Sequence, residues 1–130
     1  MAMNFLKCKR NKRDRWIPVK LNEAYLREKN LLMERLSARL TDNGNLFICG
    51  VVRKIERDDK TDSKPVIIHC DIQNSNGDIL FPVTDPHPKN MELNPYETFY
   101  LAVYHIGRFL DPAEINNATL YCQYADESLL

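Results

Sequence analysis

Short apolar runs separated by turn-forming residues cover most of the chain after residue 45. The runs are rich in aromatic or β-branched residues and span 46–52, 65–73, 79–83, 98–106 and 118–124. Short strands with turn signals between them are typical of an antiparallel β-sandwich or barrel. Residues 98–106 are apolar at both alternating sets of positions, which predicts a central strand, because a half-exposed strand alternates more strictly.

Residues 31–40 fit two patterns. Leu32, Leu36 and Leu40 repeat with helical spacing, whereas Leu36, Ala38 and Leu40 alternate as in a strand. The Asn-Gly pair at 43–44 lies between two apolar arms and indicates a hairpin with a type I′ turn, in which both central residues have positive φ. The hairpin favours a strand over 33–41, with a helix as the open alternative.

The first thirty residues differ from the rest of the chain. Six lysines and arginines lie within residues 7–15, and a short extended segment containing Pro18 follows. Asn22 is a suitable N-cap for a short helix that runs to Lys29. We therefore expect a basic N-terminal extension with a short helix over residues 1–30 and a β-sandwich domain over residues 31–130.

Composition agrees with one globular domain. The chain has 130 residues, of which 44% are hydrophobic and 28% charged, which excludes a fully disordered or collagen-like chain. No apolar run approaches the roughly 18 residues that a membrane span needs. The N-terminus lacks the apolar region of about 7–15 residues found in secretory signals. We expect a cytoplasmic protein with reduced thiols and no membrane contact, unless a leader has been removed.

The charges are divided unevenly along the chain. Residues 1–60 hold 15 basic and 8 acidic side chains, whereas residues 61–130 hold 3 and 10, so the zero net charge is the sum of +7 and −7. We interpret the basic segment as a solvated arm, since nucleic-acid-binding domains usually carry a net positive charge. The alternative is a nucleic-acid-associated protein whose phosphate-binding and base-stacking residues are Lys9, Arg10, Lys12, Arg13 and Trp16.

Few residues are arranged in a way that favours catalysis, metal binding or phosphate binding. The histidines, among them His69 and His105 within predicted strands, are not spaced as a metal site of three or four convergent ligands requires. Cys49, Cys70 and Cys122 lie in apolar runs, where cysteine acts as a small buried hydrophobe, and no Cys-x-x-Cys occurs. The four glycines form no phosphate-binding pattern. We expect no catalytic residue, no metal and no cofactor.

Aromatic residues gather near the C-terminus, and three of them are the predicted partner-binding residues, Tyr100, Tyr104 and Tyr121. The two faces of one sandwich strand cannot both be core. Outward tyrosines would form an exposed patch suited to a protein partner or to a second copy of this chain. The alternative is that the N-terminal helix covers them. We therefore predict a non-catalytic protein-interaction or self-association module that forms homo-oligomers.

Three short motifs between residues 45 and 99 carry a family resemblance. They are Gly50 with Val52 in an apolar strand, Gly77 in a hairpin, and Leu93-Asn94-Pro95 with Glu97 and Phe99 at a corner. In this order they resemble the bacterial FxLYD-type immunoglobulin-like domains, although the hairpin lacks Leu-Tyr-Asp and Tyr96 replaces the corner glycine. The resemblance implies an immunoglobulin-like β-sandwich with a binding or spacer role.

Overall fold

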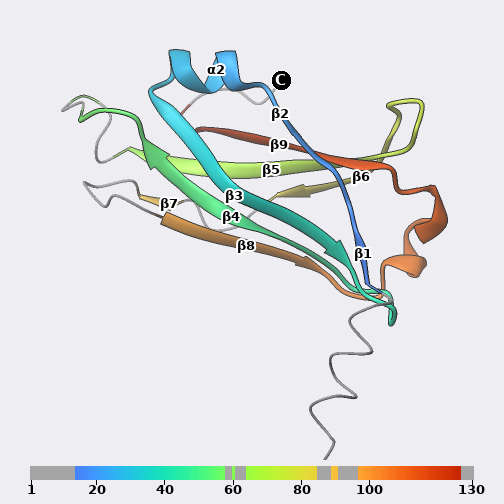
Figure 1. Ribbon diagram of the computed structural model, residues 1–130. Coiled ribbons are helices and arrows are strands. Elements are labelled where there is room, and N and C mark those ends of the chain that lie inside the picture. Colours follow the sequence, from blue (N-terminus) through green and yellow to red (C-terminus); the bar gives the residue numbers. More distant parts are fainter. Residues whose placement is uncertain (1–13, 58–59, 61–63, 85–88, 91–96, 127–130) are drawn as a thin grey trace, which may run out of the picture.

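The computed structural model describes residues 14–57, 60, 64–84, 89–90 and 97–126, and these form two β-sheets packed face to face (Figure 1). Sheet A has the strand order β1 (Arg15–Trp16), β3 (Leu31–Leu40), β4 (Leu46–Lys54) and β8 (Glu97–Val103). Sheet B has the order β2 (Val19–Leu21), β9 (Asn117–Tyr124), β5 (Pro65–Gln73) and β6 (Ile79–Thr84), with β7 (Lys89–Asn90) also paired to β5. The mainly β, two-sheet architecture is confirmed.

Three short helical segments connect the strands. Helix α2 (Glu23–Glu28) begins after Asn22, whose side chain accepts a hydrogen bond of 3.1 Å from the backbone N–H of Tyr25. The 3₁₀ turn η1 (Ile106–Arg108) follows β8, and η2 (Pro112–Glu114) precedes β9. Asp111 caps η2 through Ala113, as its Asp-Pro sequence predicts. No helix of the described residues is long and apolar enough to cross a membrane.

Residues 15–21, here called the N-terminal strap, contribute an outer strand to each sheet. β1 runs antiparallel to β3 in sheet A, and β2 runs parallel to β9 in sheet B. Between them, Ile17 is buried and its backbone N–H donates a 2.8 Å hydrogen bond to the Ala38 carbonyl. A segment that the sequence pattern assigns to the extension therefore crosses from one sheet to the other.

A β-bulge explains the mixed periodicity of residues 31–40. The register with β4 shifts between Glu34 and Ser37, and Arg35 has a φ of 54°. Before the bulge the buried residues include Met33, and after it they include Ala38, so the inward positions change from odd to even. The helical alternative for this segment is wrong, and the strand prediction is confirmed.

The turn after β3 differs from the predicted type. β3 and β4 form the expected antiparallel hairpin, but the connection is a five-residue loop, residues 41–45, in which Gly44 alone has positive φ (86°). The Thr41 hydroxyl accepts a 3.0 Å bond from the Asn45 backbone N–H, and the Thr41 N–H donates to the Asn45 carbonyl at 2.9 Å. The type I′ prediction is wrong because these threonine contacts close a wider loop.

β8 lies at the edge of sheet A, so the prediction of a central strand over 98–106 is wrong. Its inward residues are buried, with Phe99 at 1% exposure and Leu101 at 4%, whereas the outward Tyr100 is 58% exposed. The second set of apolar positions therefore faces solvent. Both sets look alike in sequence because tyrosine is amphipathic and suits either environment.

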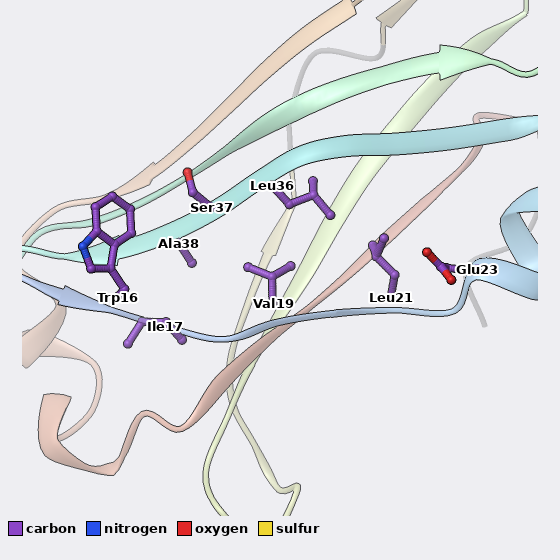
Figure 2. Close-up of a pocket in the computed structure, with 8 residues that line it drawn as sticks. All are labelled: Trp16, Ile17, Val19, Leu21, Glu23, Leu36, Ser37 and Ala38. Atoms are coloured by element: carbon purple, nitrogen blue, oxygen red, sulfur yellow. The ribbon is translucent and has the colours of Figure 1, made fainter.

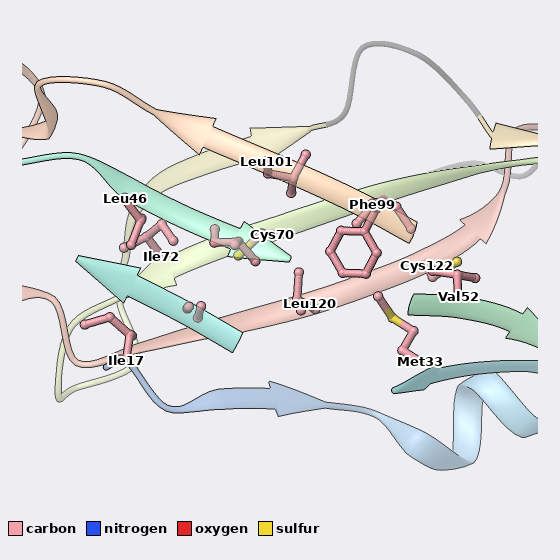
Figure 3. Packing of buried hydrophobic residues seen from close by; sticks show 14 of the residues in the cluster. Ile17, Met33, Leu46, Val52, Cys70, Ile72, Phe99, Leu101, Leu120 and Cys122 are labelled. Atoms are coloured by element: carbon pink, nitrogen blue, oxygen red, sulfur yellow. The ribbon is translucent and has the colours of Figure 1, made fainter. Parts of the chain in front are cut away.

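The core lies between the sheets and is centred on Phe99, whose ring meets side chains from both layers (Figure 3). Gly50, its cross-strand partner on β4, leaves the space that this ring fills. A Cβ at Gly50 would lie 2.9 Å from two atoms of the Phe99 ring and 2.5 Å from Leu36 Cδ2. Glycine at this position is therefore required by close packing.

We expect Gly50→Ala to lower the free energy of unfolding by about 1–3 kcal/mol, because the added methyl overpacks a buried site. The cost of overpacking outweighs the roughly 0.5–1 kcal/mol of stability that replacing a strand glycine with alanine would otherwise add. Urea denaturation of both proteins measures the difference. Gly107→Ala is the matched control, since a Cβ there meets nothing within 4 Å. Equal stability of the two variants would contradict the packing role of Gly50.

Candidate functional site

The outward side of sheet A carries a row of residues that are large on β1, β3 and β4. The strand register places Trp16 opposite Arg39, Arg39 opposite Phe47, and Phe47 opposite Ala102. Directly opposite residues point to the same face of a sheet, so the row crosses all four strands. Tyr100 lies opposite Cys49 in a neighbouring row. We call Trp16, Arg39, Phe47, Tyr100 and Tyr104 the aromatic face.

Phe47 is the centre of the aromatic face. Its ring stacks on Tyr100 with centroids 5.8 Å apart and meets the edge of Tyr104 at 6.0 Å. The Arg39 guanidinium lies 5.6 Å from the Phe47 ring centre, within cation–π range. Asp14 holds the same guanidinium through a 3.3 Å ion pair. The rings and the cation therefore fix one another before any partner binds.

Three rings of the aromatic face are open to solvent, whereas Arg39 and Phe47 are half-buried. Trp16 is 65% exposed, and Tyr100 and Tyr104 are each 58% exposed. Helix α2 instead contacts β3, burying Leu26, and lies near the end of the sandwich away from β1 (Figure 1). The alternative that this helix covers the tyrosines is therefore wrong.

Tyr121, the third predicted partner-binding residue, lies on the other sheet. It faces outward from β9 opposite His69 of β5, with ring centroids 5.8 Å apart. The structure thus brings Tyr100 and Tyr104 together and separates Tyr121 from them. Sequence reasoning also missed Arg39 and Phe47. The sequence signal for Phe47 was its position between Leu46 and Ile48. Successive side chains of a strand point to opposite faces, so Phe47 faces outward because both of its neighbours are buried.

His69 is the centre of a polar cluster on the outward side of sheet B. Its Nδ1 lies 2.6 Å from the Thr84 hydroxyl and its Nε2 lies 3.0 Å from a carboxylate oxygen of Asp71, which is buried. Burial and then the negative charge of Asp71 raise the pKa of Tyr121. Thr84 lies directly opposite His69 in register, and Asp71 is two residues along the same strand, so the three side chains point to the same face of sheet B.

A hollow of about 550 Å³ separates the N-terminal strap from β3 (Figure 2). Val19 and Leu21 of β2 point toward Leu36 of β3 across it. Glu23 and Ser37 are the charged and polar residues in its lining. Small-molecule sites usually combine an apolar wall with several convergent polar groups. The hollow is instead the space left between the strap and β3, because the strap leaves sheet A after β1 and joins sheet B at β2.

The cysteines and His105 are the remaining residues that the sequence analysis considered for chemistry. Cys70 and Cys122 are buried without a disulfide, as a small hydrophobe would be, and burial raises the pKa of each thiol to about 12. Cys49 is only half-buried and lies 3.1 Å from the Ser37 hydroxyl, so the expectation that it is a buried hydrophobe is wrong. His105 lies beyond the end of β8 with a φ of 54°, so its predicted place within a strand is wrong. Within the described part of the chain, no three His, Cys, Asp or Glu side chains gather as metal ligands.

The basic residues Lys9, Arg10, Lys12 and Arg13 of the anion-binding hypothesis lie outside the described residues. Only Trp16 of that set is described, and it belongs to the aromatic face. Nucleic-acid binding by the basic segment therefore stays a prediction.

Comparison with known proteins assigns no family. No family model matches the chain, and no curated protein matches it. A solved structure that is similar is the crystal structure of Campylobacter jejuni cj0090, with a TM-score of 0.48 and 18% identity over 82% of this chain and 96% of that one. The resemblance to FxLYD-type domains accordingly stays a prediction.

Proposed function

We propose that this protein is a non-catalytic, immunoglobulin-like β-sandwich that acts by protein–protein contact through the aromatic face. The observation that carries the proposal is the cluster of exposed Trp16, Tyr100 and Tyr104 around Phe47 and Arg39 on one side of sheet A. Trp, Tyr and Arg are the residues most enriched in the energetic centres of protein interfaces.

The mutual contacts within the aromatic face support a binding role. Binding costs about 0.5–1.5 kcal/mol for each flexible side chain that becomes ordered. Here Phe47 already contacts both tyrosine rings, and Arg39 is held by Asp14. A partner that covers these groups gains apolar contact area at a reduced entropic cost.

The strand order supports the immunoglobulin-like assignment. The chain passes from sheet A to sheet B after β4, returns before β8, and passes to sheet B again before β9. This places β3, β4 and β8 in one layer and β5 beside β9 in the other, as the A, B, E and C, F strands are placed in that fold. β2 lies where the last strand of that fold lies, but it departs from the fold because it precedes β3 in the chain and runs parallel to β9.

Retention of a partner by immobilised protein tests the proposal. We expect wild-type bait to retain a protein, which can be an untagged copy of this chain, from a lysate of the native cell. Tyr104→Lys should lower retention at least tenfold, because it places a charge in a desolvated contact, and tenfold corresponds to about 1.4 kcal/mol. The matched control is Tyr121→Lys on sheet B, which should retain the partner fully. Equal retention by the two variants, or none by wild type, contradicts the proposal.

A further inference from the structure

The free edge of β8 identifies the kind of partner. We propose that the partner is a second copy of this chain, and that two copies join their A sheets by antiparallel pairing of β8 with β8 about a two-fold axis at Tyr100. This inference goes beyond the proposed function, because the contact lies at the edge of β8, where Tyr100 of the aromatic face meets its own copy and the rest of that face stays uncovered. The result is one continuous sheet with both aromatic faces on the same side.

β8 has one unpaired edge among the described residues. It pairs with β4 along residues 97–103, and it ends the strand order of sheet A. An edge strand presents a row of backbone N–H and C=O groups that water or another strand must satisfy. A second β8 satisfies them with the geometry of the sheet already present.

The sequence of β8 holds few of the features that protect sheet edges from pairing, since its one charged residue is Glu97 at the first position. Its residues, ETFYLAV, include no proline, lysine, arginine or glycine, and none has positive φ. The other edges of the two sheets differ: β6 contains Pro82, β2 has three residues with Lys20 at the centre, and β1 has two residues. Proline and lysine on an edge prevent pairing, so β8 is the edge suited to it.

The strand is complementary to itself when it is centred on Tyr100. Phe99 then lies opposite Leu101 of the second copy, and both are buried core residues, so the apolar layer continues across the axis. Thr98 lies opposite Ala102, and the two Tyr100 side chains lie side by side at about 5 Å between Cβ atoms. All seven residues pair in this register, whereas a shift of two residues leaves five pairs.

The neighbouring surface on the same side of the sandwich is also apolar. Between β6 and β8, the rings of Phe81 and Phe109 lie 4.8 Å apart and line a hollow of about 440 Å³ with Tyr104. Phe109 is 54% exposed. The side of the sandwich that carries β8 therefore offers the second copy an apolar surface beyond the strand itself.

The expected contact area is near the lower bound for specific association. Seven residues at about 3.4 Å each give an edge about 24 Å long, and two sheets about 10 Å apart with their outward side chains are about 20 Å thick. Each copy then buries about 500 Å², and the pair about 1,000 Å², the lower limit of a specific interface. We therefore expect a reversible dimer rather than a permanent one.

Cysteine cross-linking tests the register. Tyr100→Cys brings two thiols together at the axis, where the Cα separation of about 4.5–5.5 Å suits a disulfide. Cys49 must first be replaced by serine because it lies opposite Tyr100 within the same copy, and Cys8 is replaced as well. We expect mild oxidation to convert most of the protein to a covalent dimer. Tyr121→Cys in the same background is the exposed control and should stay monomeric.

A second pair of variants excludes random collision. Thr98→Cys alone should not cross-link, since two copies of residue 98 lie about 14 Å apart in this register. Thr98→Cys combined with Ala102→Cys should form the dimer. Equal cross-linking by the single and the double variant overturns the register.

Sedimentation velocity at increasing concentration tests the association without cysteines. Wild type and Tyr121→Lys should pass from monomer to dimer, and Tyr100→Lys should stay monomeric, because like charges would meet at the axis. A wild type that stays monomeric overturns the second copy as partner. If Tyr104→Lys then still loses a different protein from the native cell, the proposed function stands and only this inference fails.

Discussion

Replacing Phe99 with alanine is expected to lower the free energy of unfolding by about 3–5 kcal/mol. Phe99 is 1% exposed and is the largest fully buried side chain of the described residues. Its ring lies over Gly50, which has no side chain to move into the space left behind. The cavity would therefore stay open, and natural domains have only about 5–15 kcal/mol of stability in total.

Urea denaturation followed by circular dichroism measures this loss, at a concentration where the protein is monomeric. The matched control is Tyr100→Ala, the next residue along β8, which removes a ring that is 58% exposed. We expect the control to change stability by no more than about 0.5 kcal/mol, as for ordinary surface positions. A similar loss in both variants would show that the outward ring is part of the core.

Raising the pH above 9 is expected to destabilise the protein through its two buried thiols. Burial raises the pKa of Cys122 from the ordinary 9.0 to about 12, and burial together with the negative charge of Asp71 does the same for Cys70. In the unfolded chain each thiol loses its proton near pH 9, whereas in the folded protein it keeps the proton to about pH 12. The folded state then binds more protons, so its stability falls as pH rises through this window.

The size of the alkaline effect follows from the same values. At about pH 10.5 each thiol costs roughly 2 kcal/mol of stability, since one pKa unit corresponds to about 1.4 kcal/mol. Tyr121, whose pKa is also raised, acts in the same direction above pH 10. Urea unfolding at neutral pH and at about pH 10.5 measures the difference.

Cysteine-to-alanine variants attribute the alkaline loss to the thiols. Cys122→Ala should be less stable than wild type at neutral pH because it leaves a small cavity. Its further loss on going to about pH 10.5 should be roughly 2 kcal/mol smaller. An unchanged alkaline loss in the double variant with Cys70→Ala would contradict the assignment and point to other groups.

Only part of the aromatic face could be predicted from the sequence pattern. Tyr100 and Tyr104 could be singled out as surface candidates because one strand cannot bury both of its faces. The sequence pattern could not assign Arg39 and Phe47 to the same surface, because they come from two other strands and meet the tyrosines only through the register of sheet A. The register of β5 with β9 in sheet B places Tyr121 beside His69 instead.

Backbone irregularities limited the local predictions in a comparable way. Arg35 adopts positive φ and inserts a bulge into β3, so the inward positions change parity and resemble a helical repeat. The loop after Leu40 contains Asn-Gly but closes through Thr41 and Asn45. The loop conformation depends on contacts between residues four positions apart, and the bulge appears as a shift in the pairing of β3 with β4, so a short-range pattern contains neither.

The sequence by itself determined the two-layer β architecture and the burial of Cys70 and Cys122, because alternation and turn residues are local properties of the chain. Only the tertiary structure decided that β8 is an edge strand and that the N-terminal strap joins both sheets. Strand order depends on pairing between distant segments, and an apolar residue has the same identity whether another layer covers it or water does. The aromatic face is exposed because no described layer covers the outward side of sheet A.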